Sequence, residues 1–302
     1  YASTSRRWRR SGSTAPRDPE GTTMTRHAFQ QVDVFGVAPY RGNPLAVVLG
    51  ADGLSDAQMA AFANWTNLSE TTFLLRPTDP AADYRVRIFT PARELSFAGH
   101  PTLGSCHAWL HAGGVPKGAE IVQECGVGLV PIRRGAGGLA FAAPPLIRSG
   151  PVAPDLVERI RTGMGLPEAA VTNAHWVDNG PGWVAVKLRS RADVLAAKPD
   201  YAALGPLKLG LVGPWEPAVD GTEAQFEIRG FVCTEGYEDP VTGSLNASVA
   251  QWLIGTGQGA EAYVAAQGTA LGRAGRVDLR RRDGAVWVGG ATVTCIEGSV
   301  AF

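Results

Sequence analysis

Residues 98–105, AGHPTLGS, place a histidine in a Gly/Pro turn that opens an apolar helix, and we expect the chain to be organised around this turn. Shortly upstream, residues 67–73 (NLSETTF) place a glutamate just before an apolar, strand-like run. Far downstream, residues 238–244 (EDPVTGS) open a second apolar helix in a similar way. Both helices carry a Trp-Leu pair near their end. These features predict a diverged internal repeat in which His100 corresponds to Asp239, with the Trp-Leu pairs about one helical turn apart.

The composition is that of an ordinary globular protein with a hydrophobic core. The 302 residues are 45% hydrophobic and 19% charged, which is enough for one large domain or two of about 140 residues. No run of roughly 18 apolar residues occurs, so we expect no membrane-spanning segment. The formal net charge is zero, so the folded part lacks the basic surplus of a nucleic-acid-binding protein.

Residues 1–26 are rich in Ser, Thr, Arg, Gly and Pro without periodicity, so we expect a disordered basic extension. Six arginines against Asp18 and Glu20 leave a net charge of +4 there and −4 on the remainder. No apolar segment follows these arginines as a secretory signal requires, and the four cysteines show no C-x-x-C pair. Both features predict a cytoplasmic protein with reduced cysteines.

Two halves are expected on either side of a proline-bearing connection. Residues 27–145 would form the half that contains Glu70 and His100, and residues 146–302 the half that contains Asp239. Each half mixes short strands with one central apolar helix, which predicts an α+β fold. The last strand is free to return to the first half.

The two turns predict a ligand site between the halves. A helix N-terminus presents unpaired backbone N–H groups and a partial positive charge. We expect one such helix over residues 102–111 and the other from the Asp239 turn to Ile254. If the halves are related by a pseudo-twofold axis, both helix ends point into one cleft, which would suit a carboxylate substrate.

Three polar side chains would enter this cleft. Glu70 would supply a carboxyl group that exchanges a proton, provided that an apolar environment raises its pKa towards neutrality. His100 and Asp239 would orient the substrate or the proton. Taken singly, each has a plainer explanation: a surface carboxylate, a satisfied turn histidine and a helix N-cap. The pattern alone leaves these explanations open.

Three other kinds of site lack residues that they need. An epimerase with two thiols needs a cysteine in each repeat turn, and neither turn has one. His107 and His111 lack the glutamate of an H-E-x-x-H metal site. No P-loop or G-x-G-x-x-G motif occurs. A non-catalytic dimeric binding protein on the same scaffold stays open as an alternative.

Several motifs, in order, resemble the phenazine-biosynthesis PhzF-like family. The motifs are residues 42–47 (GNPLAV), 67–73 (NLSETTF), 87–91 (RIFTP), 94–101 (ELSFAGHP), 238–244 (EDPVTGS) and 267–273 (QGTALGR). The resemblance runs from about His27 to the C-terminus. Ser96, where many relatives have proline, and residues 245–248 depart from the family pattern.

This resemblance implies a diaminopimelate epimerase-like fold, with each half a curled, mostly antiparallel sheet or barrel around a central helix. The family's type member isomerises trans-2,3-dihydro-3-hydroxyanthranilate without a metal or organic cofactor. The resemblance therefore implies a homodimeric, cofactor-independent isomerase of that acid or of another small cyclic or unsaturated carboxylic acid. Glu70 would be its acid and base, assisted by His100 and Asp239. The residues expected to hold the substrate are Asn43, Gly99, Gly243 and Ser244.

Overall fold

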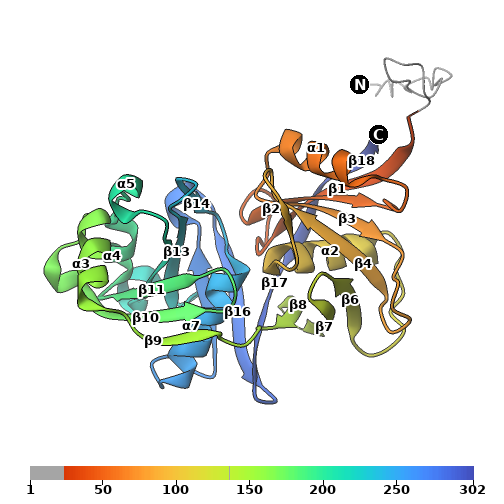
Figure 1. Ribbon diagram of the computed structural model, residues 1–302. Coiled ribbons are helices and arrows are strands. Elements are labelled where there is room, and N and C mark those ends of the chain that lie inside the picture. Colours follow the sequence, from red (N-terminus) through yellow and green to blue (C-terminus); the bar gives the residue numbers. More distant parts are fainter. Residues whose placement is uncertain (1–23, 136) are drawn as a thin grey trace, which may run out of the picture.

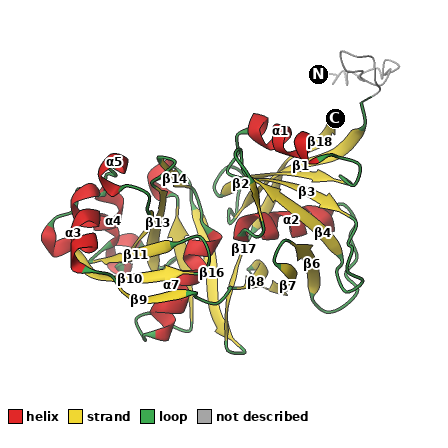
Figure 2. Ribbon diagram, in the orientation of Figure 1, coloured by secondary structure: helices red, strands yellow, loops and turns green. Residues whose placement is uncertain are grey.

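The computed structural model describes residues 24–135 and 137–302 and shows two lobes packed side by side (Figure 1). The expected basic extension falls outside the described residues except for residues 24–26. Strands make up most of both lobes, and each lobe contains one central helix (Figure 2). The predicted α+β class is confirmed.

Each lobe is built from one continuous part of the chain, apart from the last strand. The first lobe contains β1 (Arg26–Val34), β2 (Asn43–Leu49), α1 (Asp56–Thr66), β3 (Thr71–Leu75), β4 (Tyr84–Phe89), β5 (Glu94–Leu95), α2 (Gly99–His111), β6 (Ile121–Cys125), β7 (Gly128–Gly135) and β8 (Gly138–Ala142). The second begins with β9 (Arg148–Pro151), α3 (Pro154–Gly163), β10 (Val171–Asp178), β11 (Trp183–Leu188), α4 (Arg191–Ala196), α5 (Tyr201–Leu204), β12 (Lys208–Pro214) and α6 (Pro217–Asp220). It continues with β13 (Phe226–Val232), β14 (Tyr237–Asp239), α7 (Gly243–Gly255), β15 (Ala262–Gln267), β16 (Gly275–Arg282) and β17 (Ala285–Gly290). The last strand, β18 (Thr292–Ala301), returns to the first lobe.

The two lobes repeat one connectivity. In the first lobe β2 is parallel to β3, the strands β3, β4 and β5 are antiparallel neighbours, and β6 returns parallel to β4 after α2. In the second lobe β11 to β15 follow the same pattern around α7. Three antiparallel strands complete each unit, β6–β8 and β15–β17. This connectivity is the internal repeat that the two turns predict.

The predicted register of that repeat is wrong. Both central helices begin at a glycine and are 13 residues long, so Gly99 corresponds to Gly243 and His100 to Ser244. In this register the two Trp-Leu pairs are displaced by a single residue. Asp239 ends strand β14, before its helix begins, and therefore does not correspond to His100.

Two strand pairings join distant parts of the chain. β17 of the second lobe pairs with β8 of the first. The last strand, β18, pairs antiparallel with β1 and so lies in the first lobe, which places the described start of the chain beside its C-terminus (Figure 1). The lobes are therefore joined by the β17–β8 pairing and by two covalent connections, from β8 to β9 and from β17 to β18.

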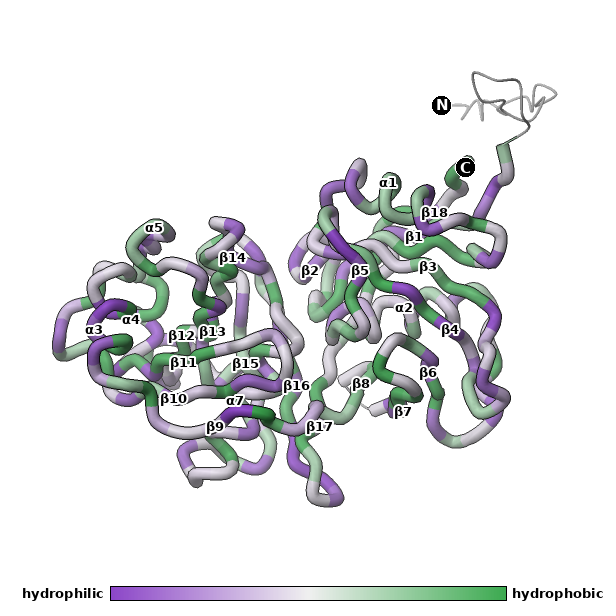
Figure 3. The backbone as a smooth tube through the Cα atoms, viewed as in Figure 1, coloured by the Kyte–Doolittle hydropathy of each residue, from purple (hydrophilic) through white to green (hydrophobic). Residues whose placement is uncertain are grey.

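Helices α2 and α7 are buried because they carry apolar or small side chains on nearly every face. One cluster of buried side chains extends through both lobes, from Val32 in β1 to Val288 in β17, and the apolar segments run through the interior of each lobe (Figure 3). Helix α1 lies outside and buries only Met59 and Ala63. Among the described helices, none has the length and apolar character needed to cross a membrane.

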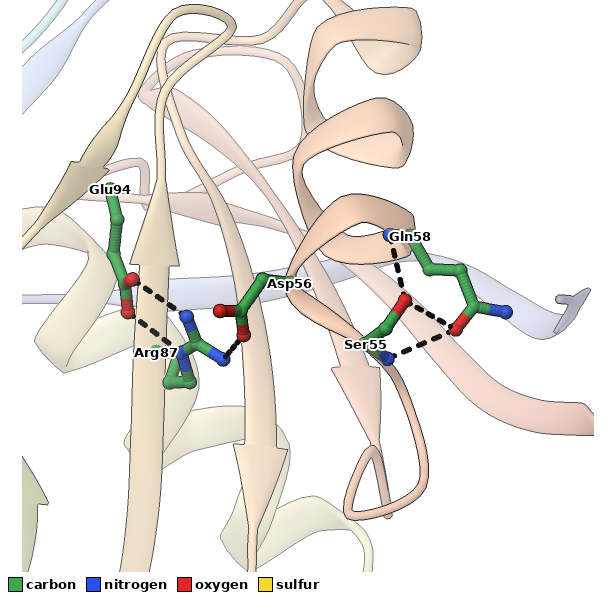
Figure 4. Close-up of polar contacts among 5 residues, drawn as sticks. All are labelled: Ser55, Asp56, Gln58, Arg87 and Glu94. Carbon is green, nitrogen blue, oxygen red and sulfur yellow. Dashed lines mark hydrogen bonds and ion pairs between the residues drawn. The ribbon is translucent and has the colours of Figure 1, made fainter.

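Polar contacts fix the edge of the first lobe near the β4–β5 hairpin (Figure 4). Ser55 and Gln58 form a capping box at the start of α1. Arg87 on β4 donates hydrogen bonds of 2.7 Å to both carboxylate oxygens of Glu94 and one of 2.6 Å to Asp56. The carboxylate of Glu94 is therefore neutralised by a bidentate ion pair with Arg87.

The backbones of α2 and α7 touch where the two helices begin. A Cβ atom on Gly99 would lie 3.1 Å from the Cα of Gly243, and a Cβ on Gly243 would lie 3.1 Å from the Cα of Gly99. The contact is reciprocal, as expected on a pseudo-twofold axis. Any side chain at either position would push one helix end away from the other.

Replacing Gly243 by alanine is expected to lower the free energy of unfolding by about 1–3 kcal/mol, because the added methyl group overpacks this contact. The matched control is Gly255→Ala at the other end of α7, where the nearest atom to an added Cβ is 4.0 Å away. That control should be neutral or stabilising by up to about 1 kcal/mol, since alanine favours a helix over glycine. Urea denaturation of both variants measures the difference; equal effects would contradict the importance of the contact.

Candidate active site

A cleft of about 580 Å³ lies between the lobes at the ends where α2 and α7 begin. Its lining comes from both lobes and includes all the expected site residues except Asn43: Glu70, Gly99, His100, Asp239, Gly243 and Ser244. Asn43 is fully buried behind them. The structure therefore brings the predicted residues together, and it places one of them in a supporting position.

Both helix ends face the cleft without a side-chain cap. The N-cap of α2 is Ala98, which has no polar group, and the N-cap of α7 is Thr242, which makes no side-chain hydrogen bond to its helix. The hydroxyl group of Thr242 instead donates a hydrogen bond to Asp239. The partial positive charge of both helix ends therefore stays available to an anionic ligand.

Glu70 stands immediately before β3, with its side chain 16% exposed at the wall of the cleft. Burial raises the pKa of its carboxyl group to about 8, and the nearby carboxylates of Asp239 and Glu235 add to this effect while Lys208 opposes it. Near neutral pH the group is thus mostly protonated but retains a substantial carboxylate fraction. Both directions of proton transfer are accessible to it.

His100 lies against Glu70, with its Nε2 atom 3.2 Å from the Glu70 Oε2 atom. The pair is not aligned as a hydrogen bond, and neither atom has another partner among the described residues. Burial lowers the pKa of His100 to about 3, so the imidazole is neutral at physiological pH. Two buried polar atoms are therefore left for a third group in the cleft.

Asn43 determines which nitrogen of His100 carries the hydrogen. Its Nδ2 atom lies 3.4 Å from the Nδ1 atom of His100 and donates to the Oδ1 atom of Asp239 and the carbonyl oxygen of Val241, both at 3.0 Å. Both hydrogens of this amide group are used in the two 3.0 Å bonds, and an amide nitrogen cannot accept a hydrogen bond from Nδ1–H. The contact therefore favours the tautomer with the hydrogen on Nε2, towards Glu70. Asn43 also joins the lobes, because it belongs to β2 while its acceptors Asp239 and Val241 belong to the second lobe.

Asp239 reaches the cleft with both carboxyl oxygens already bonded. Oδ2 accepts a hydrogen bond of 2.5 Å from the Thr242 hydroxyl group, and Oδ1 accepts from Asn43. Burial raises the pKa of this carboxyl group, while the hydrogen bonds from Thr242 and Asn43 oppose the increase. Compared with Glu70, Asp239 is held more tightly and has less freedom to exchange a proton with a ligand.

Gln267 is a supporting residue to which the sequence analysis assigned no role. Its Oε1 atom accepts from the Thr242 backbone at 3.0 Å and from Asn246 at 2.7 Å. Its Nε2 atom donates to the Thr242 hydroxyl group at 2.9 Å and to the Asp239 carbonyl oxygen at 3.1 Å. The only signal for it was its place in the motif of residues 267–273.

Trp183 and Asn179 were missed altogether. The indole N–H of Trp183 donates to the Ser244 hydroxyl group, and the Asn179 amide donates to the Ser244 carbonyl oxygen, both at 3.0 Å. Trp183 is 61 residues away from Ser244 in the chain. No local pattern could have linked these positions.

The cysteines do not contribute to this site. All four are free, and none lines the cleft. Burial in α2 raises the pKa of the Cys106 thiol to about 12. Within the part of the chain that the structure describes, no three His, Cys, Asp or Glu side chains gather as metal ligands do.

Comparisons with known proteins place the chain among related sequences. Residues 32–298 match the family model described as phenazine biosynthesis-like protein. The chain is 37% identical over 300 residues to antisense-enhancing sequence 1 of Schizosaccharomyces pombe, covering 91% of this chain and 99% of that one. It is 33% identical over 237 residues to the trans-2,3-dihydro-3-hydroxyanthranilate isomerase of Pseudomonas chlororaphis, covering 77% and 81%. A Bacillus anthracis protein of the PhzF family has the same fold, with a TM-score of 0.79 at 22% identity over 92% of this chain and 99% of that one.

Replacing Glu70 by glutamine is expected to stabilise the fold increasingly as the pH rises from 4.5 to 8. The folded-state pKa of about 8 lies above the ordinary value of 4.5, so between these values the folded protein retains a proton that the unfolded chain has released. The stabilisation from this proton is fully present below pH 4.5 and is lost as the pH rises through 8, by up to about 1.4 kcal/mol per pH unit. Glutamine does not titrate, so the variant escapes this loss.

Urea denaturation of the wild type and Glu70→Gln at several pH values measures the effect. Glu235→Gln controls for removal of a nearby negative charge, because Glu235 is exposed and does not line the cleft. A stability difference between Glu70→Gln and wild type that stays constant with pH would contradict the raised pKa.

Proposed function

The chain belongs to the phenazine biosynthesis-like family and is an isomerase, and we propose that it moves a proton between two carbons of a small cyclic or unsaturated carboxylic acid with Glu70 as acid and base. The observation that carries this proposal is the carboxyl group of Glu70. Its pKa of about 8 makes both protonation states accessible, and it lies beside the Nε2 atom of His100, which has no hydrogen-bond partner among the residues that the structure describes. The first and second lobes contribute to one site.

In the proposed reaction the substrate's carboxylate lies at the ends of α2 and α7. The carboxylate form of Glu70 removes a proton from a carbon next to the conjugated system, so that the C–H bond breaks and its electron pair spreads towards the bound carboxylate. Backbone N–H groups at the helix ends stabilise the charge that develops there. Glu70 then returns the proton to another carbon of the same system, so the substrate and product have the same number of protons.

His100 and Asp239 support this transfer in different ways. His100 is neutral and presents Nε2–H, so it orients Glu70 or a substrate oxygen by donating a hydrogen bond. Asp239 holds Asn43, which in turn holds the His100 ring. We propose that these side chains suffice without a metal or organic cofactor, because the helix ends provide the electron-withdrawing groups that the reaction needs.

The first substrate to test is trans-2,3-dihydro-3-hydroxyanthranilate, after which the P. chlororaphis relative is named. In deuterated water the wild type is expected to consume this acid, with deuterium entering carbon, as followed by absorbance and NMR. Glu70→Gln should lower the rate at least about 100-fold, since it removes the group that transfers the proton. Glu235→Gln, the same substitution outside the cleft lining, should retain most of the rate.

Each other outcome has a distinct meaning. If the wild type leaves this acid unchanged, it is not the substrate, and other small acids should be tested in the same way. If Glu70→Gln retains the wild-type rate, Glu70 is not the acid and base. If the wild type binds acids but transfers no proton in any of them, the non-catalytic binding protein becomes the better explanation.

A further inference from the structure

Lys208 occupies in the second lobe the position that Glu70 occupies in the first. On β3, Thr72 faces the central helix α2, where its hydroxyl group accepts a hydrogen bond from Ser105. On β12, Gly210 faces the central helix α7, where an added Cβ would meet Leu245. Two residues before each of these positions, on the same face, are Glu70 and Lys208. The pseudo-twofold repeat therefore directs both side chains into one cleft, and both line it.

Lys208 is part of a row of side chains across four neighbouring strands of the second lobe. The strand register sets Lys208 opposite Trp183 on β11 and opposite Val232 on β13, and it sets Val232 opposite Tyr237 on β14. Directly paired residues project from the same face of a sheet. All four line the cleft, so its wall presents one ammonium group beside an indole ring and an isopropyl group, with a phenol ring next in the row.

The ammonium group of Lys208 is half-buried and has no carboxylate partner within ion-pair distance among the described residues. Burial lowers its pKa, and the guanidinium group of Arg93 lowers it further, although Glu235, Asp178 and Glu70 act in the opposite direction. Placing a charge in a partly buried site without a partner is costly. An anion in the cleft would remove that cost.

Arg93 supplies a second cation from the first lobe. It lies in the turn between β4 and β5 and also lines the cleft. Its neighbour Glu94 does not neutralise it, because the Glu94 carboxylate is held by Arg87 (Figure 4). Arg93 and Lys208 therefore face the cleft from opposite lobes as two cations, neither of which has a bound carboxylate among the described residues.

Building on the isomerase function proposed above, we propose that Lys208 and Arg93 bind a second anionic group, so that the cleft prefers a small diacid to an acid with a single carboxylate. The first carboxylate lies at the ends of α2 and α7. There the Nε2 atom of His100, whose side chain is 5% exposed, has no hydrogen-bond partner in the described part of the chain. The two anionic groups would hold the carbon skeleton between them, within reach of Glu70.

Matched acids and variants test this inference by binding alone. Benzoate carries one carboxylate, whereas isophthalate and terephthalate carry a second at two different separations. Isothermal titration calorimetry should show at least one diacid binding to the wild type about tenfold more tightly than benzoate, as expected for one added charge-assisted contact. Lys208→Met should lose most of this advantage and keep its affinity for benzoate. Arg93→Met should lose part of it.

Lys198→Met is the control, since it removes the same charge from an exposed site on the same lobe, away from the cleft lining, and should behave as the wild type. The inference is overturned if neither diacid binds the wild type more tightly than benzoate, or if the advantage survives in Lys208→Met. It is also overturned if Lys208→Met loses affinity for benzoate, because a single carboxylate would then lie at Lys208. Arg93 is exposed, so Arg93→Met gives an answer even if Lys208→Met fails to fold. Binding does not need turnover, so failure of the deuterium experiment would leave this result intact.

Discussion

The contact between the backbones of Gly99 and Gly243 is the constraint on which the site depends. Two helix ends that touch without side chains bring two partial positive charges together at one place. Neither is cancelled by a side-chain cap, and both border the cleft between the lobes. Asn43 reinforces the arrangement by bonding across the lobes to Asp239 and Val241. The depth at which Glu70 and His100 are buried follows from this close approach.

A nearly symmetric scaffold carries asymmetric chemistry. In the repeat, His100 corresponds to Ser244 and Glu70 corresponds to Lys208. Asp239 corresponds to the apolar residue Leu95, because Asp239 pairs with Gly230 as Leu95 pairs with Ile88. The two residues of each pair differ in charge or in their ability to transfer a proton, although they occupy equivalent backbone positions in the two lobes. A ligand between the lobes would therefore meet a carboxyl group on one side and a cation on the other.

Several features of the site could be predicted from the sequence, and the others depend on contacts between distant residues. The Gly/Pro turns and the apolar helices led to the two lobes and the cleft, and the family resemblance that the motifs indicated is confirmed. The predicted register of the repeat was wrong because it matched the proline and glycine spacing of the two turns. The two helices instead correspond through Gly99 and Gly243, which are in contact where the helices begin. Gln267 and Trp183 could not be assigned because their partners lie far along the chain. Asn43 was expected to touch the substrate, but its amide group is used in holding His100 and Asp239.

The pairing of β1 with β18 has a consequence for how the molecule is made. Most of the first lobe is synthesised before the second, yet its strand β18 is synthesised after the second lobe, so the first lobe cannot close until translation has passed residue 301. The repeat unit β10–β17 does not depend on β18, so the second lobe can complete its own repeat earlier. The backbone hydrogen bonds between Thr25 and Phe302 also place the two ends of the described chain next to each other. A short linker there would allow the chain to be opened elsewhere, as in a circular permutant, without removing any strand from either lobe.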